Sequence, residues 1–228
     1  MKTVAFVFGR FNPPTIGHGK LLDALKATAQ RMRADRYIFM SNTEDTKKNP
    51  LTKQVKTKYM KKMFPSDKKY IRQKHKGVIR HVFDIANNFN DEYDKLVMVA
   101  GSDRVSEFHS ILNTYNGMKG KHGFYEYDEI EVVSAGERDP DAEGATGMSA
   151  SKMREAAVKG DFETFKLGVP STMGDSDTKD MMNSVRKGMK LDVIIERMKV
   201  RRGVQEPLEV ENIDPIDAKE LTWQGYDT

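Results

Sequence analysis

The residues best suited to chemistry lie in two short stretches of the chain. The first stretch, residues 9–18, reads Gly-Arg-Phe-Asn-Pro-Pro-Thr-Ile-Gly-His, follows an apolar run at residues 4–8 and leads into a helical pattern near Leu21. A strand, a turn rich in glycine and proline, and a helix form the first step of an open α/β sheet. In such sheets, ligands bind beyond the carboxyl ends of the strands, where helix N-termini point at them. We therefore expect residues 9–18 to bind a phosphate group.

Several residues of this stretch have a use in phosphate binding. Gly9 lets the chain turn off the strand, and Gly17 leaves room for a flat base against the backbone. Thr15 and His18 are three residues apart at the start of a helix, so their side chains share a face. The imidazole can donate a hydrogen bond to a phosphate oxygen without acting as a base. The alternative is a capped helix with an incidental histidine, and the complete ten-residue pattern favours phosphate binding.

The second stretch, residues 147–154, reads Gly-Met-Ser-Ala-Ser-Lys-Met-Arg. Ser149 is a suitable N-cap for a helix, and free N–H groups and the helix dipole favour an anion there. Ser151 and Arg154 are one turn apart and can contact the same phosphate, which the planar guanidinium binds through two N–H groups. A plain helix cap is the alternative for this stretch alone, but its pairing with residues 9–18 favours a second phosphate contact.

The elements that must position these residues alternate between strands and helices. Apolar or β-branched runs predict strands, and apolar residues at helical spacing predict helices. The expected strands are residues 3–8, 35–41, 95–100 and 130–133; the expected helices are residues 15–33, 51–64, 78–89, 104–115, 148–159 and 180–200. This alternation indicates an α/β fold, a Rossmann-like parallel sheet with helices on both faces.

Composition narrows the class of protein further. The 228 residues are 38% hydrophobic and 32% charged, and they include no cysteine, which excludes disulfides and thiolate chemistry. No apolar run is long enough for a membrane span, so we expect a cytoplasmic protein. We expect a catalytic domain at residues 1–168, a helical extension at 169–203 and an acidic tail at 204–228, extended or disordered. The apolar stripe of the helix at 180–200 suits domain packing or a homo-oligomer interface.

Charge is distributed unevenly along the chain. Residues 47–76 contain twelve lysines and arginines and one acid, whereas the tail contains seven acids and one lysine. The basic segment, Lys47 to Lys76, is either a solvated helix face or a surface that attracts polyanions. It leaves open a nucleic-acid-binding protein that has lost its phosphate chemistry.

Both stretches and a third short segment resemble the motifs of a known family. Residues 9–18 resemble the G-x-F-(D/N)-P-x-(H/T)-x-G-H signature of the HxGH nucleotidyltransferase superfamily, which is cytidylyltransferase-like in fold. Residues 148–154 are similar to its I-S-(S/T)-T-x-x-R motif. Gly101-Ser102-Asp103 resembles a G-(S/A)-D element of the nicotinamide mononucleotide adenylyltransferases, the branch that the chain resembles most closely. The resemblance covers about residues 1–168.

The resemblance implies transfer of a nucleotidyl group from a nucleoside triphosphate to a phosphate on an acceptor, with release of pyrophosphate. No covalent enzyme intermediate is expected, so catalysis rests on positioning and charge stabilisation. Mg²⁺ would be bound mainly through the triphosphate. The implied catalytic residues are His18, Thr15 and Arg154; the implied nucleotide-binding residues are Gly9, Arg10, Phe11, Asn12, Gly17, Ser149, Ser151 and Lys152; Ser102 and Asp103 would lie near a ribose or the second substrate.

The resemblance also bears on the choice of substrates. An arginine at the position of Arg154 is typical of adenylyl-transferring branches, so ATP is favoured over CTP, and nicotinamide mononucleotide is the favoured acceptor. A cytidylyltransferase acting on a sugar or headgroup phosphate stays open, because residues 145–149 resemble part of the motif of that branch. Two departures matter: Thr15 stands where many members have a first histidine, and Ala150 replaces a common hydroxyl residue.

Overall fold

The computed structural model describes residues 1–136 and 147–191, and within them the fold is α/β. Five strands form one sheet in the order β3-β2-β1-β6-β7, and every pairing in it is parallel. The strands are β1 (Thr3–Gly9), β2 (Asp35–Met40), β3 (Ile71–Arg72), β6 (Lys95–Ala100) and β7 (Glu129–Ser134). The Rossmann-like sheet expected from the sequence is confirmed.

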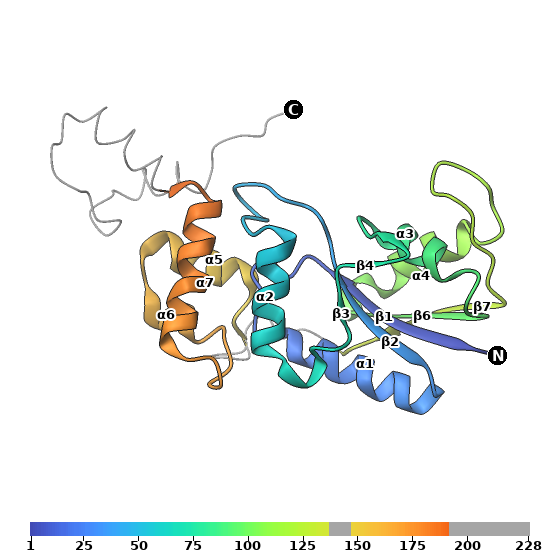
Figure 1. Cartoon of the computed structure of the whole chain (residues 1–228), viewed down its shortest axis with the longest axis horizontal. Coiled ribbons are helices and arrows are strands. Elements are labelled where there is room, and N and C mark those ends of the chain that lie inside the picture. Colours follow the sequence, from blue (N-terminus) through green and yellow to red (C-terminus); the bar gives the residue numbers. More distant parts are fainter. Residues whose placement is uncertain (137–146, 192–228) are drawn as a thin grey trace, which may run out of the picture.

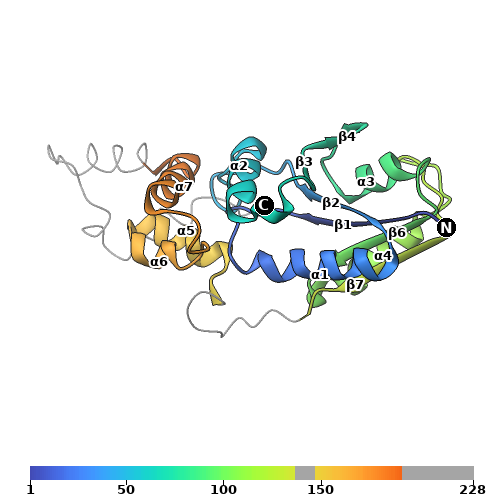
Figure 2. The same ribbon diagram turned by 60° about the horizontal axis from the view of Figure 1, so that its bottom comes forward.

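Strand β1 lies at the centre of the sheet because its residues are apolar on both faces. Val4, Ala5, Phe6 and Val7 have no exposed surface. Ala5 and Val7 pack in one cluster with α1 (His18–Met32), while Val4 and Phe6 pack in another with α3 (Val82–Phe89) and α4 (Val105–Thr114). Helices thus cover both faces of the sheet (Figures 1 and 2).

A second group of helices lies to one side of the sheet, with α2 (Lys53–Met63) next to the strands and α5, α6 and α7 beyond it (Figure 1). The three outer helices are α5 (Ala150–Lys159), α6 (Phe162–Lys166) and α7 (Asp175–Gly188). They share an apolar cluster with α2 in which Met153, Phe165 and Met181 have no exposed surface. This helical group brings the second phosphate stretch up to the end of the sheet.

Two of the expected helices begin three or four residues later than predicted. The helix expected at residues 78–89 begins at Val82, because residues 77–78 form β5 (Gly77–Val78), which pairs with β4 (Lys74–His75). The helix expected at 15–33 begins at His18, because residues 15–17 form a turn in which His18 N–H donates to the Thr15 carbonyl. Single turns of 3₁₀ helix occur at Pro65–Asp67 and Ser102–Arg104.

The helix expected at 180–200 is wrong at its start. Helix α7 begins at Asp175 and ends at Gly188, and Lys190 has a φ of +58° in the left-handed region that breaks a regular helix. Residues 192–200 lie outside the described residues, as does the acidic tail. The described part of the apolar stripe, including Met181 and Val185, is buried within the chain's own core. None of the described helices is both long and apolar enough to cross a membrane.

Candidate active site

Residues 9–18 leave the sheet where its strand order reverses. Strand β1 pairs with β2 on one side and with β6 on the other, so the chain crosses the sheet in opposite directions from this point. Crevices at such switch points are the usual ligand sites of open α/β sheets. Two backbone hydrogen bonds fix the segment there: the Ser41 N–H donates to the Gly9 carbonyl, and the Ile16 N–H donates to the Gly168 carbonyl at 2.7 Å. The first stretch therefore lies between the sheet and the helical group.

The turn after β1 is shaped by Phe11. Its φ of +46° is rare for a residue with a side chain, and its ring is buried. The ring lies over Gly9, where an added Cβ would come within 2.9 Å of it, and its centroid is 4.7 Å from that of His18. Gly9 is thus needed for close approach of the ring, which in turn contacts the imidazole.

Asn12 connects this turn to the start of α2. Its side chain is buried, donates to the Leu51 carbonyl at 3.0 Å and accepts from the Leu51 N–H at 2.9 Å. These two bonds satisfy the backbone N–H and carbonyl of Leu51, which would otherwise be buried without partners. Asn12 was expected as a nucleotide-binding residue, but its amide is occupied by the protein itself, which leaves its backbone facing the second stretch.

The geometry of Thr15 fixes the orientation of His18. The Thr15 backbone N–H donates to His18 Nδ1 at 2.8 Å, and the Thr15 hydroxyl lies 3.0 Å from the same atom. Because a backbone N–H can only donate, Nδ1 accepts, and the proton of the neutral imidazole is on Nε2. Thr15 itself is buried. Its contacts therefore make Nε2 a hydrogen-bond donor.

The second stretch reaches the first through Arg154. One guanidinium nitrogen donates to the Asn12 carbonyl at 2.7 Å, and the other donates to Ser151 Oγ at 3.0 Å. A Cβ added at Gly17 would lie 3.8 Å from the Met148 carbonyl oxygen, so the backbones of the two stretches also lie close together. Two segments more than 130 residues apart in the sequence thus form one site.

The start of α5 has the expected form. Ser149 is its N-cap and accepts a hydrogen bond from Lys152 N–H at 3.2 Å. Ser151 and Lys152 are exposed on the first turn, whereas Met153 is buried beneath them. The apolar side of α5 therefore fixes the helix, and its polar first turn stays accessible to a ligand.

Electrostatics at the junction favour an anion. Burial lowers the pKa of Arg154, and the neighbouring positive charge of Arg10 lowers it further, while Asp45 opposes both effects. Burial would raise the pKa of the Asp45 carboxyl, but hydrogen bonds from Asn49 and from the backbone of Lys48 and Lys47 outweigh burial and lower it. The Asp45 carboxylate thus binds within its own loop, which leaves the guanidinium groups of Arg10 and Arg154 available to bind a phosphate.

Ser102 and Asp103 are not joined to the rest of the site. Both follow β6, so they lie at the same edge of the sheet as the first stretch, and both are exposed. Within residues 1–136 and 147–191, no hydrogen bond or ion pair links them to either phosphate stretch. A Cβ at Gly101 would approach Asp103 Oδ1 to 2.8 Å, so the glycine permits this tight turn.

Helix α2 carries a buried lysine that the sequence did not predict as part of the site. Lys56 on α2 has no exposed surface, and its Nζ donates to the Ser41 carbonyl at 2.7 Å. Burial lowers its pKa to about 8; Glu44 raises it and Lys53 lowers it. The signal that could have identified Lys56 is its position one turn before the buried Tyr59 and Met60 of the same helix face. Lys56 thus holds the loop that carries Asp45.

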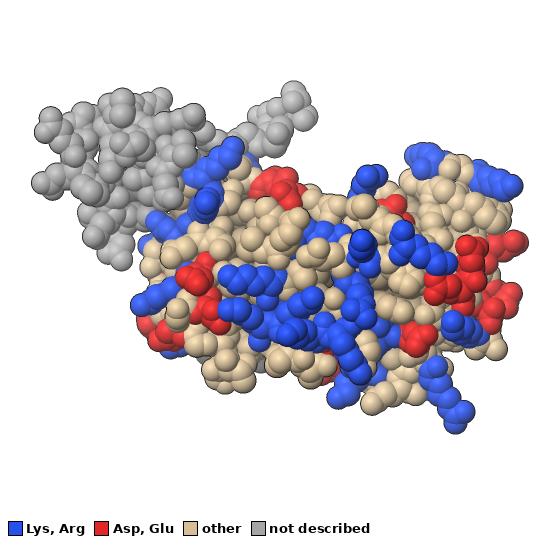
Figure 3. All heavy atoms as spheres, viewed as in Figure 1, with Lys and Arg blue, Asp and Glu red and all other residues tan. Residues whose placement is uncertain are grey.

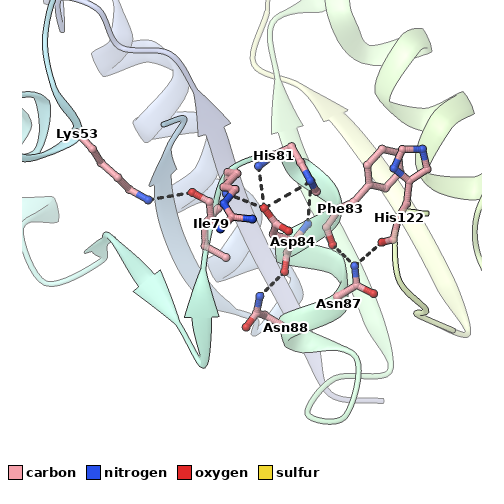
Figure 4. Close-up of polar contacts among 9 residues, drawn as sticks. Lys53, Ile79, His81, Phe83, Asp84, Asn87, Asn88 and His122 are labelled. Atoms are coloured by element: carbon pink, nitrogen blue, oxygen red, sulfur yellow. Dashed lines mark hydrogen bonds and ion pairs between the residues drawn. The ribbon is translucent and has the colours of Figure 1, made fainter. Parts of the chain in front are cut away.

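This loop borders a pocket of about 390 Å³ beyond the ends of β2 and β3. Its lining is mostly polar and consists of Asn42, Glu44, Lys53, Gln54, Gln73, Lys74 and Val78. Asn42 Oδ1 is buried and has no hydrogen-bond partner in the described part of the chain. Lys53 crosses to the Ile79 carbonyl at 2.9 Å, next to the His81–Asp84 capping box that begins α3 (Figure 4). These hydrogen bonds hold in place the wall of the pocket that lies next to α3.

Metal ligands are scarce around the site. Residues 1–136 and 147–191 contain no group of three histidine, aspartate or glutamate side chains that could hold a metal ion. The side chains at the junction of the two stretches are cationic or neutral, which suits an anion better than a bare cation. The donor set fits a Mg²⁺ ion that arrives with the phosphates of its ligand.

Comparison with known proteins gives one family. The profile of the cytidylyltransferase-like family matches residues 6–156, a span that includes both phosphate stretches. A solved structure of a proposed nicotinate-nucleotide adenylyltransferase from Vibrio parahaemolyticus is similar to this chain. The identity is 12%, the TM-score is 0.43, and the match covers 80% of this chain and 99% of that one. A search of curated proteins gave no match.

Proposed function

The chain belongs to the cytidylyltransferase-like family and is a nucleotidyltransferase, and we propose that it transfers AMP from ATP to a phosphate-bearing acceptor. The acceptor that we propose is nicotinamide mononucleotide, which would make the products NAD and pyrophosphate and give the enzyme a role in NAD biosynthesis. The observation that carries the ATP site is the Arg154 guanidinium, which contacts both phosphate stretches at once. One triphosphate bound beside it would touch both.

In this mechanism the acceptor's phosphate oxygen attacks the α-phosphorus of ATP in line, and pyrophosphate leaves. The attacking phosphate is already ionised at neutral pH, so no general base is required. His18 donates from Nε2 to a phosphate oxygen as negative charge develops, and Thr15 keeps the imidazole in that tautomer. Mg²⁺, bound through the triphosphate, would neutralise part of the charge on its oxygens.

The remaining side chains would bind the leaving group. Ser151 and Arg154 lie on one turn of α5 and would hold the β- and γ-phosphates, with Ser149 and Lys152 at the same helix start. Arg10 would add a second guanidinium charge. Because these groups are fixed before the nucleotide binds, they would stabilise the leaving pyrophosphate without reorganising.

The acceptor is inferred from residues 101–103 and from a pocket beside the site. Residues 101–103 favour nicotinamide mononucleotide through their resemblance, and within the described residues no hydrogen bond or ion pair joins Asp103 to the phosphate stretches. The loop that carries Asp45, whose charge acts on Arg154, also lines the polar pocket beside Asn42 and Lys53, so this pocket would suit the non-reacting part of an acceptor.

The test is pyrophosphate release from each of the common nucleoside triphosphates with a panel of acceptors. The panel contains nicotinamide mononucleotide, nicotinate mononucleotide, phosphopantetheine, a sugar phosphate and a headgroup phosphate. We expect ATP with nicotinamide mononucleotide to turn over fastest. Fastest turnover with CTP and a sugar or headgroup phosphate would instead identify a cytidylyltransferase.

Arg154 gives that test a matched pair of variants. Arg154→Lys keeps a positive charge but loses the planar fork, so we expect it to recover little of the activity that Arg154→Ala loses. Losing such a contact should cost about 10²-fold in kcat/KM for ATP. Full activity of Arg154→Ala would show that the guanidinium is not needed for the reaction.

A further inference from the structure

One surface of the molecule is strongly basic. In the view of Figure 3, lysine and arginine side chains gather across the middle of the molecule, over α2 and toward β3, while acidic side chains lie toward the two ends. Helix α2 contributes lysines and no acids, and the segment after it adds more. We call the exposed basic residues of α2 and of residues 65–74 the lysine face; they are Lys58, Lys62, Lys68, Lys69, Arg72 and Lys74.

The structure separates the basic residues with internal partners from those left exposed. Lys53 and Lys56 bond to backbone carbonyls, and Lys62 pairs with Asp177. The only acid between residues 47 and 76, Asp67, is buried against Arg36 at 3.1 Å. Five of the six residues of the lysine face have no acidic partner in the part of the chain that the structure describes: Lys58, Lys68, Lys69, Arg72 and Lys74.

An ordinary solvated helix face intersperses acids with its lysines, because like charges one turn apart repel each other. The lysine face lacks that compensation. The acidic tail lowers the charge of the whole chain to +4, so residues 1–203 alone carry a net charge of +10. Concentrated, unpaired cations of this kind attract polyanions, and phosphate backbones release counterions when such lysines replace them.

We propose that the lysine face binds the phosphate backbone of a nucleic acid without regard to sequence, in addition to the nucleotidyltransferase activity. The face lies apart from the phosphate contacts that we propose for the first turns of α1 and α5, and of its residues only Lys74 also lines the pocket proposed for the acceptor. It therefore differs from the nucleic-acid-binding protein without catalysis considered from the sequence. Five of the six residues of the face are lysines, which act as point charges rather than as planar forks, so the face favours backbone contacts, which position a protein but carry no sequence information.

The test measures the binding of the full-length protein to a fluorescently labelled duplex DNA of about 24 base pairs. Anisotropy titrations between about 50 and 200 mM salt should give a dissociation constant that rises steeply with salt. Lys58→Gln/Lys68→Gln should reduce the magnitude of the log–log salt slope by roughly 2, since each duplex phosphate contact contributes about 0.9. Pyrophosphate release by this double variant should match that of the unmodified protein.

The matched control is Lys119→Gln/Lys121→Gln. These two exposed lysines lie in the segment between α4 and β7, at the far end of the sheet from α2 (Figure 1), and their loss changes the net charge equally. The control should keep the original salt slope. Three results would each overturn the proposal: no salt-dependent binding, equal weakening in the control, or displacement of the DNA by excess ATP and Mg²⁺, which would place binding in the nucleotide site. None of them affects the catalytic test, so the two proposals fail independently.

Discussion

The two phosphate stretches are fixed in opposite ways. Residues 9–18 form a loop whose shape depends on polar contacts: Asn12 binds Leu51, and Thr15 binds His18. Residues 147–154 begin a regular helix whose position depends on the apolar packing of Met153 beneath it. In the first stretch the residues that build the loop, Asn12 and Thr15, also hold Arg154 and His18 in place for a ligand. In the second stretch these tasks fall to different residues.

This difference predicts how each stretch responds to mutation. Substitutions in the loop should change stability and activity together, since a lost contact releases both the backbone and the ligand-facing groups. Substitutions at Ser151 or Lys152, on the exposed turn of α5, should change activity alone. Paired measurements of kcat/KM and of the free energy of unfolding test this comparison directly.

The largest effect is expected for His18→Ala. Loss of one well-placed donor to developing charge typically costs about 10²–10³ in kcat. Because the imidazole accepts the Thr15 backbone N–H, the thermal unfolding midpoint should fall together with the activity, while the protein still folds. His18→Asn, which keeps a donor, is the comparison and should retain part of the activity. Unchanged kcat in a folded His18→Ala protein would exclude the imidazole from the mechanism.

Asn12→Ala should be the most destabilising change in the site. It leaves the N–H and carbonyl of Leu51 buried without partners, which costs about 1–3 kcal/mol in the free energy of unfolding. Activity should fall as well, because the Asn12 carbonyl orients Arg154. Urea unfolding and kcat/KM for ATP give the two readouts. A loss of activity with no loss of stability would mean that the loop is not built as described.

Ser151→Ala should have a smaller effect, confined to activity. The hydroxyl lies on the exposed first turn of α5 and would donate to a phosphate oxygen of ATP, a hydrogen bond that would contribute about 1 kcal/mol to nucleotide binding. We expect a rise of several-fold in KM for ATP at an unchanged unfolding midpoint. A marked drop in that midpoint would contradict the claim that the exposed residues of α5 affect activity alone.

The pH dependence of Lys56 gives the most subtle prediction. Burial lowers its pKa from 10.5 to about 8 in the folded protein. Between those two pH values the unfolded chain binds more protons, so this group raises the free energy of unfolding as pH increases through that window. Wild type should therefore gain stability relative to Lys56→Met over this range, measured by urea unfolding at several pH values. Lys58→Met, on the exposed side of α2, is the control and should show no such gain.

The sequence predicted those elements whose pattern reflects burial on both sides. The run at residues 95–100 is apolar throughout, so its strand was predicted with the bounds that the structure has. Strand β3 was missed, because two residues at a sheet edge leave no periodic pattern. Ser149 was predicted as a cap since its hydroxyl acts locally. The helix face of Lys56 could be predicted, but its partner Ser41 and the Asn12–Leu51 pair could not, because contacts across 15 and 39 residues leave no local trace.

The Phe11 ring occupies the space that a side chain at position 9 would fill. Sequence drift at these two positions is consequently coupled: an alanine in place of Gly9 is tolerated only alongside a smaller residue in place of Phe11. That exchange would also take away the aromatic surface against which the imidazole rests. Homologues that change one position without the other should therefore be rare, and those that change both should have reshaped their phosphate contacts.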